Sequence, residues 1–242
     1  MSSSIQQAPG SGEEFTEVVV VRHGKTACNA SHIVQGQLDP ELSRDGKEQA
    51  ILVASRLSRE AKQPAAVYSS DLRRAAETAE IIARACDVPN MVLNEALREM
   101  HMGYLQGLTW ADARARNNYG GYNIFQIRDG GDPDQRRQQV PGGGESLNQL
   151  NERLVSYMNM IAREHIGERV VVVSHEAAIM ELCRHTDPPD SPIVREIPNT
   201  SLNDFYISSL TGQWILDNCA DVKHLEEDGR PENSSGGDGA SA

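Results

Sequence analysis

Two unbroken runs of valine, each closed by a histidine, constrain the fold of this chain most strongly. Residues 18 to 23 read VVVVRH, and residues 170 to 175 read VVVVSH. β-Branched residues without polar alternation are typical of strands that are buried on both faces, as in a parallel sheet. Ligands of open α/β sheets bind beyond the carboxyl ends of the strands, so parallel neighbouring strands would bring His23 and His175 to one rim.

The pattern around these runs predicts an α/β fold. Strands are predicted at Phe15 to Val21, Ala65 to Ser70 and 168 to 175. Helical spacing of apolar residues covers Ser43 to Lys62, Asp71 to Cys86 and Ser146 to His165. We expect Ser146 to cap the last of these helices and Ser70 or Asp71 to cap the second. Strands that alternate with helices predict βαβ units and a mostly parallel central sheet with helices on both sides.

The chain is expected to form one domain between two flexible ends. Its 242 residues contain 38% hydrophobic amino acids, which suits one sizeable core. Residues 1 to 14 and 225 to 242 are rich in Gly, Ser and acidic residues and lack periodicity, so the domain is expected over residues 15 to 224. The pattern at residues 204 to 208 and 214 to 217 predicts a terminal hairpin or an edge pair of strands. The Gly-, Asp-, Arg- and Gln-rich stretch within Thr109 to Val140 predicts an insertion that lies over one end of the sheet.

Charge and composition narrow the function classes. A formal net charge of -12 argues against nucleic acid and anionic membranes as partners, so a small anionic metabolite would need a local cluster of positive groups. The apolar runs are too short to span a membrane, and we expect a cytoplasmic protein. The spacing of the cysteines indicates reduced thiols rather than a disulfide framework or a zinc cluster; they are Cys28, Cys86, Cys183 and Cys219.

Arginines accompany the predicted strand ends. Arg22 precedes His23, and Arg73 and Arg74 fall in the first turn of a predicted helix. A guanidinium group beside the free N–H groups of a helix N-terminus is a receptor for phosphate. Arg22 and Arg74 would lower the pKa of His23 and keep its imidazole neutral, which is the form that attacks phosphorus. His175 would add a donor to the phosphoryl oxygens.

A carboxyl group and a glycine-rich turn complete the predicted site. Glu99 lies in a glycine-containing loop, where it can protonate a leaving alkoxide and later take a proton from water. Residues 141 to 146, PGGGES, offer backbone N–H groups before a helix. The arginines supply the charge that Mg²⁺ supplies elsewhere, and Ile179 stands where the zinc motif H-E-x-x-H has its second histidine. We therefore expect neither a metal nor a cofactor.

Together these segments resemble the histidine phosphatase superfamily, in its phosphoglycerate mutase-like branch. The segments are RHGKTACN, YSSDLRRAAETA, LREMHMGYLQGL, PGGGES and VVVVSHEA, and the likeness covers residues 16 to 224. It implies a three-layer α/β/α sandwich, His23 as nucleophile and Glu99 as proton donor. It also implies a phosphate pocket of Arg22, Arg74 and His175. Further, it implies Asn29 as an extra phosphate contact, Thr26 as support of the first loop, and Arg74 rather than Arg73 as the pocket arginine.

Two positions depart from the pattern of this family. Residue 25 is usually acidic or Gln and is Lys25 here, and the residue after the second histidine is usually Gly and is Glu176 here. A carboxylate beside a bound phosphate opposes binding, whereas a nearby lysine offsets that repulsion. We therefore expect Lys25 and Glu176 to tune the pocket as a compensating ion pair.

The resemblance leaves three functions open. The first is a metal-independent phosphomonoesterase that acts on a small phosphorylated metabolite through a phosphohistidine. The second is a phosphoglycerate mutase, because LQGL at residues 105 to 108 is mutase-like and Arg136 and Arg137 could bind a carboxylate, although a solvated charged loop is the simpler interpretation. The third is a phosphate-binding pseudoenzyme, because of Glu176. The phosphatase is favoured, since the mutase-like continuation N-K-A-E is absent after LQGL.

Overall fold

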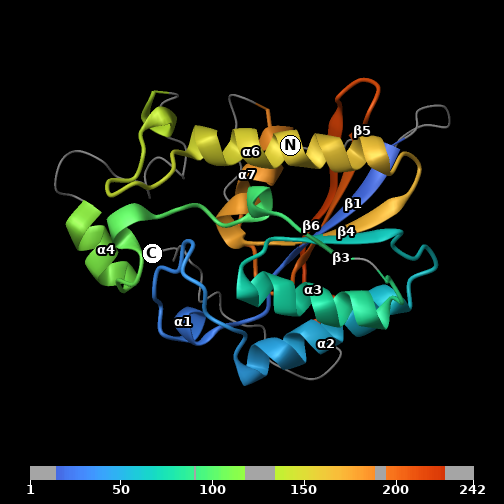
Figure 1. Ribbon diagram of the computed structural model, residues 1–242, viewed down its shortest axis with the longest axis horizontal. Helices are drawn as coiled ribbons and strands as arrows, with labels where there is room; N and C mark the ends of the chain where they lie inside the picture. Colours follow the sequence, from blue (N-terminus) through green and yellow to red (C-terminus); the bar gives the residue numbers. More distant parts are fainter. Residues whose placement is uncertain (1–14, 90, 118–133, 189–194, 227–242) are drawn as a thin grey trace, which may run out of the picture.

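The computed structural model describes residues 15–89, 91–117, 134–188 and 195–226 and contains a six-stranded sheet in the order β3-β2-β4-β1-β5-β6 (Figure 1). The strands are β1 (Phe15–Arg22), β2 (Ala66–Ser69), β3 (Met91–Leu93), β4 (Arg169–Ser174), β5 (Leu202–Ser208) and β6 (Trp214–Asp221). β1 to β4 pair in parallel, whereas β5 and β6 add an antiparallel edge. The prediction of a mostly parallel sheet is confirmed.

Helices cover both faces of this sheet. They are α1 (Ala27–Ala30), α2 (Arg44–Ser58), α3 (Arg73–Ala85), α4 (Trp110–Asn117), α6 (Leu147–Glu164), α7 (Glu176–Thr186) and α8 (Lys223–Glu226). Short 3₁₀ helices are η1 (Glu95–Leu97), η2 (Gly103–Leu105) and η3 (Gln135–Arg137). Figure 1 shows α6 and α7 on one side of the sheet and α2 and α3 on the other. The three-layer α/β/α architecture is therefore as predicted.

The valine runs explain why the sheet is covered on both faces. Val18 and Val20 are fully buried in the core cluster that contains the apolar residues of α6 and α7. Val19 and Val21 are fully buried in the second cluster, against α2 and α3. Since successive side chains of a strand point to opposite faces, an unbroken apolar run supplies both cores at once.

Local signals in the sequence agree with the structure at α6 and disagree at α3. Ser146 caps α6, and its hydroxyl accepts a hydrogen bond from the N–H of Gln149 in a capping box. At α3 the N-cap is Leu72, without a side-chain cap, so the prediction of Ser70 or Asp71 was wrong. The Ser70 hydroxyl instead accepts a hydrogen bond from the N–H of Leu72, and the Asp71 carboxylate forms an ion pair with Arg98.

The segments at the margins of the predicted domain are partly described. Helix α4 begins the predicted insertion and η3 lies near its end, whereas residues 118–133 lie outside the described residues. Helix α8 extends two residues beyond the predicted C-terminal boundary at residue 224, and Leu225 is buried within it. The predicted flexible end at residues 1–14, and the predicted end at residues 225–242 apart from Leu225 and Glu226, also lie outside the described part of the chain.

All four cysteines are free thiols, but two of them are neighbours in space. The Sγ atoms of Cys183, on α7, and Cys219, on β6, are 3.8 Å apart. The scattered spacing in the sequence hid this approach, because α7 packs beside β6 only after the sheet is assembled.

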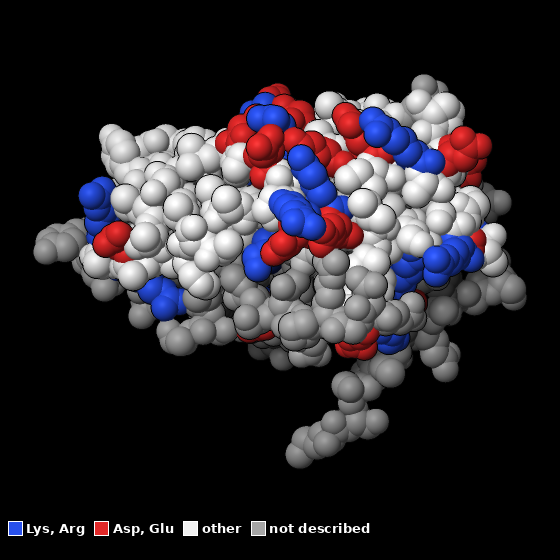
Figure 2. Space-filling model, turned by 90° about the horizontal axis from the view of Figure 1, so that it is seen from below, with Lys and Arg blue, Asp and Glu red and all other residues white. Residues whose placement is uncertain are grey.

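Charged side chains are mixed on the face that Figure 2 shows, where Lys and Arg stand among Asp and Glu. On α2 and α3 they form exposed pairs four residues apart, such as Arg44–Glu48 and Arg84–Glu80. Separately, no helix among the described residues is both long and apolar enough to cross a bilayer.

Two glycines allow the loop after β1 to pack against α2. A Cβ atom on Gly24 would lie 2.4 Å from the carbonyl oxygen of Gly46, and a Cβ on Gly46 would overlap the carbonyl oxygen of Lys25. Both partners are backbone atoms, which cannot rotate away as a side chain can. The backbone of the loop that contains His23 therefore touches the first turn of α2.

We predict that Gly46→Ala destabilises the protein by about 1–3 kcal/mol, because the added methyl group overpacks a backbone contact. Helix propensity alone predicts the opposite sign, since Ala is favoured over Gly within a helix by about 1 kcal/mol. Chemical denaturation of Lys47→Ala, at an exposed neighbouring position, serves as the control. A Gly46→Ala variant as stable as the wild type would refute the close packing.

Candidate active site

The two histidines that follow the valine runs lie side by side at the carboxyl edge of the sheet. β1 and β4 pair in the register Val21 with Val173, which brings the loops after both strands to one place. The ring centroids of His23 and His175 are 5.1 Å apart, and both residues are fully buried. The predicted convergence of the two imidazoles is confirmed.

The His23 ring is held as one neutral tautomer. Its Nδ1 lies 2.7 Å from the carbonyl oxygen of Gly24, which can only accept, so Nδ1 carries the proton. Its Nε2 accepts a hydrogen bond from Nε of Arg74 at 3.2 Å. Burial, followed by the charges of Arg74 and Arg22, holds the pKa of His23 well below 6.5. A lone pair therefore stands on Nε2 at neutral pH, beside a guanidinium group.

The guanidinium group of Arg74 binds two backbone carbonyl oxygens. Its Nη1 donates to Leu38 O at 2.7 Å and its Nη2 to Gly36 O at 2.8 Å. The residue is fully buried in the first turn of α3, whereas the side chain of the adjacent Arg73 is 58% exposed and pairs with Glu41. Of the two arginines, the structure thus brings Arg74 to the histidines and turns Arg73 towards solvent.

His175 presents unsatisfied nitrogens in the same place. It is the N-cap residue of α7, and neither of its buried ring nitrogens has a hydrogen-bond partner among the described residues. Burial and the neighbouring charge of Arg74 hold the pKa of His175 well below 6.5. Buried polar atoms without partners are costly, so this ring is suited to a ligand that offers hydrogen-bond partners.

Arg22 forms a different set of contacts from Arg74. Its Nη1 donates to Ile197 O at 2.6 Å and lies 3.1 Å from Oε2 of Glu176, with both side chains almost entirely buried. The expected ion pair between Lys25 and Glu176 was wrong, because Glu176 pairs with Arg22 instead. Lys25 is half-buried and has no ion pair within the described residues; its backbone N–H binds the side chain of Gln49. Strand β1 points Arg22 to the first turn of α7, whereas Lys25 lies on the loop that packs against α2.

The carboxylate of Glu99 reaches the site from the loop after η1. Its Oε1 accepts from the N–H of Met100 at 2.7 Å, and its Oε2 accepts from the N–H of Ala177 at 3.1 Å. Ala177 lies in the first turn of α7, two residues after His175, and Glu99 is only 3% exposed. The structure therefore brings Glu99 to the same helix start as His175.

Arg153 supports this loop and was not identified from the sequence. It extends from α6 and donates to the carbonyl oxygens of Ala96, Arg98 and Glu99 at 2.8 to 3.0 Å. Its guanidinium also binds both carboxylate oxygens of Glu145, at 2.7 and 2.9 Å. The ion pair with Arg153 contributes to holding the pKa of Glu145 below its usual value, although burial opposes this effect.

Two amides of the glycine-rich segment before α6 already have hydrogen-bond partners. The N–H groups of Gly144 and Glu145 donate to Val140 O and His101 O. A Cβ atom on Gly144 would lie 2.5 Å from Cβ of Val140, so this turn is closely packed. The only sequence signal for Arg153 was its place eight residues after Glu145, which is not specific.

The loop after His23 is built on a buried polar network. Thr26 caps α1 in a capping box with Asn29, whose Oδ1 accepts from the N–H of Thr26 at 3.0 Å. The Thr26 hydroxyl also lies 2.9 Å from Oε1 of Gln35.

The two residues after Gln35 connect this network to the site. The carbonyl oxygen of Gly36 accepts a hydrogen bond from Arg74, and Nε2 of Gln37 donates to the carbonyl oxygen of Glu99. Nothing in the sequence of this stretch marked it as the link between Arg74 and Glu99.

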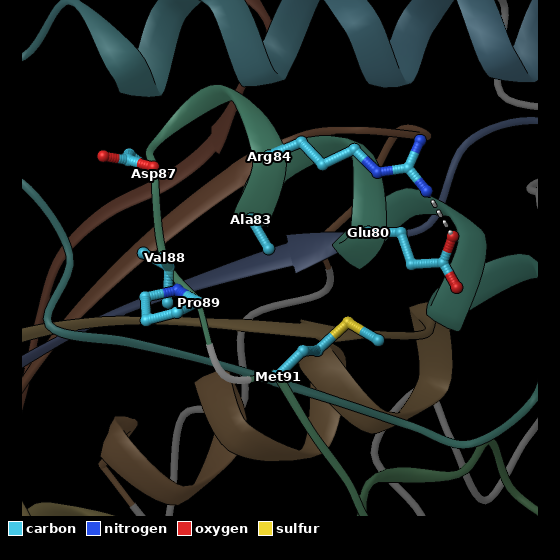
Figure 3. Close-up of a pocket in the computed structure, with 7 residues that line it drawn as sticks. All are labelled: Glu80, Ala83, Arg84, Asp87, Val88, Pro89 and Met91. Carbon is cyan, nitrogen blue, oxygen red and sulfur yellow. Dashed lines mark hydrogen bonds and ion pairs between the residues drawn. The ribbon is translucent and has the colours of Figure 1, made fainter.

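A surface pocket lies elsewhere and does not belong to this cluster. Figure 3 shows the pocket, of about 410 Å³, at the C-terminal end of α3, with Arg84 and Glu80 on its rim. Arg74 lies about 15 Å away along the same helix, given a rise of about 1.5 Å per residue. Within the ranges that the structure describes, no group of three or more His, Cys, Asp and Glu side chains is arranged to hold a metal ion.

Comparison with known proteins agrees with this geometry. The family model described as histidine phosphatase superfamily (branch 1) matches residues 18–220. Phosphoglycerate mutase-like protein 4 of Arabidopsis thaliana is 40% identical over 225 residues, which cover 93% of this chain and 94% of the relative. The metal-independent phosphoserine phosphatase of the same plant is 37% identical over 225 residues, 93% and 90% of the two chains. A solved phosphoglycerate mutase from Bacillus anthracis, 22% identical, has the same fold, with a TM-score of 0.72 over 90% of this chain and 98% of its own.

A match over most of the chain, together with relatives at 37% and 40% identity, establishes the family. The chain belongs to branch 1 of the histidine phosphatase superfamily and is an enzyme of the histidine phosphatase type.

Proposed function

We propose that this protein hydrolyses small phosphomonoesters without a metal ion, through a phosphohistidine at His23. The observation that carries the proposal is the orientation of His23. Its proton is fixed on Nδ1 by Gly24 O, and the Nε2 lone pair stands beside Arg74. A neutral imidazole held in this way is a nucleophile without further activation, and Gly24 O stabilises the positive charge that develops on the ring during attack.

The reaction proceeds in two displacements. In the first, the Nε2 lone pair of His23 forms a bond to phosphorus, the ester P–O bond breaks, and Glu99 gives a proton to the departing alkoxide. In the second, Glu99 takes a proton from water, the resulting hydroxide attacks phosphorus, and the N–P bond breaks to release phosphate. One carboxyl group thus serves as acid and then as base.

Positive and hydrogen-bonding groups stabilise the phosphoryl group in both displacements. Arg74 and Arg22 supply two guanidinium charges, and His175 supplies a ring N–H that has no partner among the described residues. Asn29, which lies in α1, is a further proposed contact to the phosphoryl group. In a buried site such donors are preorganised and lose little to solvent, so they lower the barrier more than they would in water.

Two observations favour hydrolysis over a mutase reaction. A relative at 37% identity is named a metal-independent phosphoserine phosphatase. In addition, Arg136, which a mutase would use to bind a substrate carboxylate, forms a buried ion pair with Glu181 on α7. The interpretation of Arg136 and Arg137 as a solvated charged loop was wrong for Arg136, whose charge is paired, but agrees with Arg137, whose side chain is 72% exposed. Phosphoserine and phosphoglycerates are accordingly the first substrates to test.

The function is tested with p-nitrophenyl phosphate in the presence of EDTA. We expect turnover that resists the chelator and falls by at least about 10³-fold in His23→Ala, since removal of a covalent nucleophile abolishes the main path. His185→Gln, at the exposed far end of α7, is the control for loss of a histidine. Rapid-quench experiments should trap an acid-labile phosphoryl adduct on His23. Absence of turnover on every phosphomonoester would leave a phosphate-binding pseudoenzyme.

A panel of substrates separates hydrolase from mutase. We expect phosphate release from phosphoserine or 3-phosphoglycerate that does not depend on added 2,3-bisphosphoglycerate. Interconversion of phosphoglycerates only in the presence of the bisphosphate would show that the phosphohistidine is transferred back to substrate, and would replace the hydrolase with a mutase.

The protonation state of His23 is testable without turnover. Because its pKa is held well below 6.5, its ring should stay neutral at pH 6, where an ordinary imidazole is about three-quarters protonated. The ¹⁵N spectrum of labelled imidazoles, assigned with His23→Gln, should show the proton on Nδ1 at pH 6 and protonation only at lower pH. A ring that titrates near 6.5 would remove the proposed basis for nucleophilicity.

Arg153 is predicted to act on catalysis only through the position of Glu99. Arg153→Met should slow hydrolysis of alkyl phosphates by about 10²-fold, because an alkoxide needs protonation as it leaves. With p-nitrophenyl phosphate, whose leaving group is stable as an anion, the loss should be several times smaller. Arg163→Met, at an exposed position of the same helix, is the control. Equal losses for both kinds of substrate would indicate general destabilisation rather than a misplaced acid.

A further inference from the structure

Glu176 introduces a negative charge beside the cluster of histidines and arginines. It is the first residue of α7, it is 4% exposed, and its Oε2 lies 3.1 Å from Nη1 of Arg22. Its predecessor in the chain is His175, whose ring lies beside His23. The carboxylate therefore occupies one side of a guanidinium group that the proposed function assigns to the bound phosphoryl group.

The contact has two separable physical effects on Arg22. First, Glu176 and the carbonyl oxygen of Ile197 bind the same Nη1, which fixes the orientation of the guanidinium plane. Second, the carboxylate neutralises the charge of Arg22 at short range in a region with little solvent, where charges are screened weakly. Two of the contacts of Arg74, by contrast, are with the uncharged carbonyl oxygens of Gly36 and Leu38.

Phosphate reaches this site as an anion and competes with Glu176 for Arg22. The arriving anion gains attraction to Arg22 and meets repulsion from the carboxylate. Both the substrate and the product phosphate carry the phosphoryl group, so this repulsion lowers the affinity of the site for both. The lower affinity for phosphate matters most, because phosphate must leave before the next turnover. A glycine at position 176 would exert no such repulsion.

We propose that Glu176 is a positioning residue that holds Arg22 and lowers the affinity of the site for free phosphate, so that product release does not limit turnover. The inference rests on the proposed function, because it takes Arg22 as a phosphate contact. It goes further in assigning a role to a carboxylate that takes no part in either displacement.

Two substitutions separate the charge of Glu176 from its shape. Glu176→Gln keeps the length and the hydrogen-bonding oxygen but removes the charge, whereas Glu176→Asp keeps the charge and shortens the side chain. Calorimetric titration with inorganic phosphate at pH 7.5 should give about tenfold tighter binding for Glu176→Gln and a dissociation constant within about threefold of wild type for Glu176→Asp. Glu80→Gln, an exposed carboxylate on α3, controls for a general change in net charge.

Steady-state kinetics provide a second measure of the same effect. In Glu176→Gln the KM for p-nitrophenyl phosphate and the inhibition constant of inorganic phosphate should fall together by about tenfold, with no rise in kcat. A purely structural role for the ion pair predicts instead that both substitutions weaken phosphate binding and lower kcat. Unchanged or weaker phosphate binding in Glu176→Gln, or equal behaviour of the Gln and Asp variants, would overturn the proposal.

Removal of the carboxylate leaves the buried Arg22 without this counter-charge, so thermal unfolding of each variant is recorded first. Should Glu176→Gln fail to fold, Glu176→Gly carries the same test, since glycine is accepted at the start of a helix. Failure of both to fold would identify the pair as structural and overturn the proposal.

Failure of the proposed function gives a different result. If the wild type binds phosphate but hydrolyses no phosphomonoester, tighter phosphate binding by Glu176→Gln still supports the inference and rejects only the hydrolase. If the wild type is an active phosphatase and phosphate binding is insensitive to the charge at position 176, the inference fails and the function stands.

Discussion

The parallel pairing of β1 with β4 is the constraint on which the rest of the structure depends. It aligns Val21 with Val173, and the N–H of His23 donates to Ser174 O at 3.0 Å, so the chain leaves both strands at the same level. A shift of one residue along one strand would move one imidazole by about 3.3 Å and point it to the other face of the sheet. Unbroken valine runs make the strands fully buried but do not select the register by themselves.

Burial then determines the electrostatics of the site. With His23 and His175 fully enclosed, a charged imidazole would lose its hydration, and the two neighbouring guanidinium groups add repulsion, so both rings are kept neutral. The arginines differ in how they are held. Two contacts of Arg74 are with carbonyl oxygens, whereas Arg22 contacts both a carbonyl oxygen and the carboxylate of Glu176. The two arginines therefore differ in these contacts, although the sequence presents both simply as arginines near a strand end.

Features that depend on the local sequence pattern were predictable, whereas contacts between segments far apart in the chain were not. The strands, the covered sheet and the convergence of His23 with His175 depend on local hydrophobic pattern and on parallel pairing, and these were predictable. The choice of Arg74 over Arg73 came from resemblance to the family. Arg153 was missed, and Glu176 was assigned the wrong partner, because each contact joins segments whose proximity depends on the assembled tertiary structure. Lys25 is close to His23 in the chain, but the contact of its loop with α2 carries it away from α7.

Three consecutive residues at the junction of β4 with α7 contact three different parts of the site. His175 is still extended, with φ −131° and ψ 169°, and its ring lies beside His23. Glu176 begins the helix and reaches Arg22, and the N–H of Ala177, free of intrahelical bonding at a helix start, binds Glu99. Because helical residues are rotated by about 100° from one to the next, three neighbouring positions can face three different partners. Any rotation of the first turn of α7 would therefore disturb the predicted phosphate donor, the charge of Arg22 and the proton donor together, which couples binding and catalysis through one turn of helix.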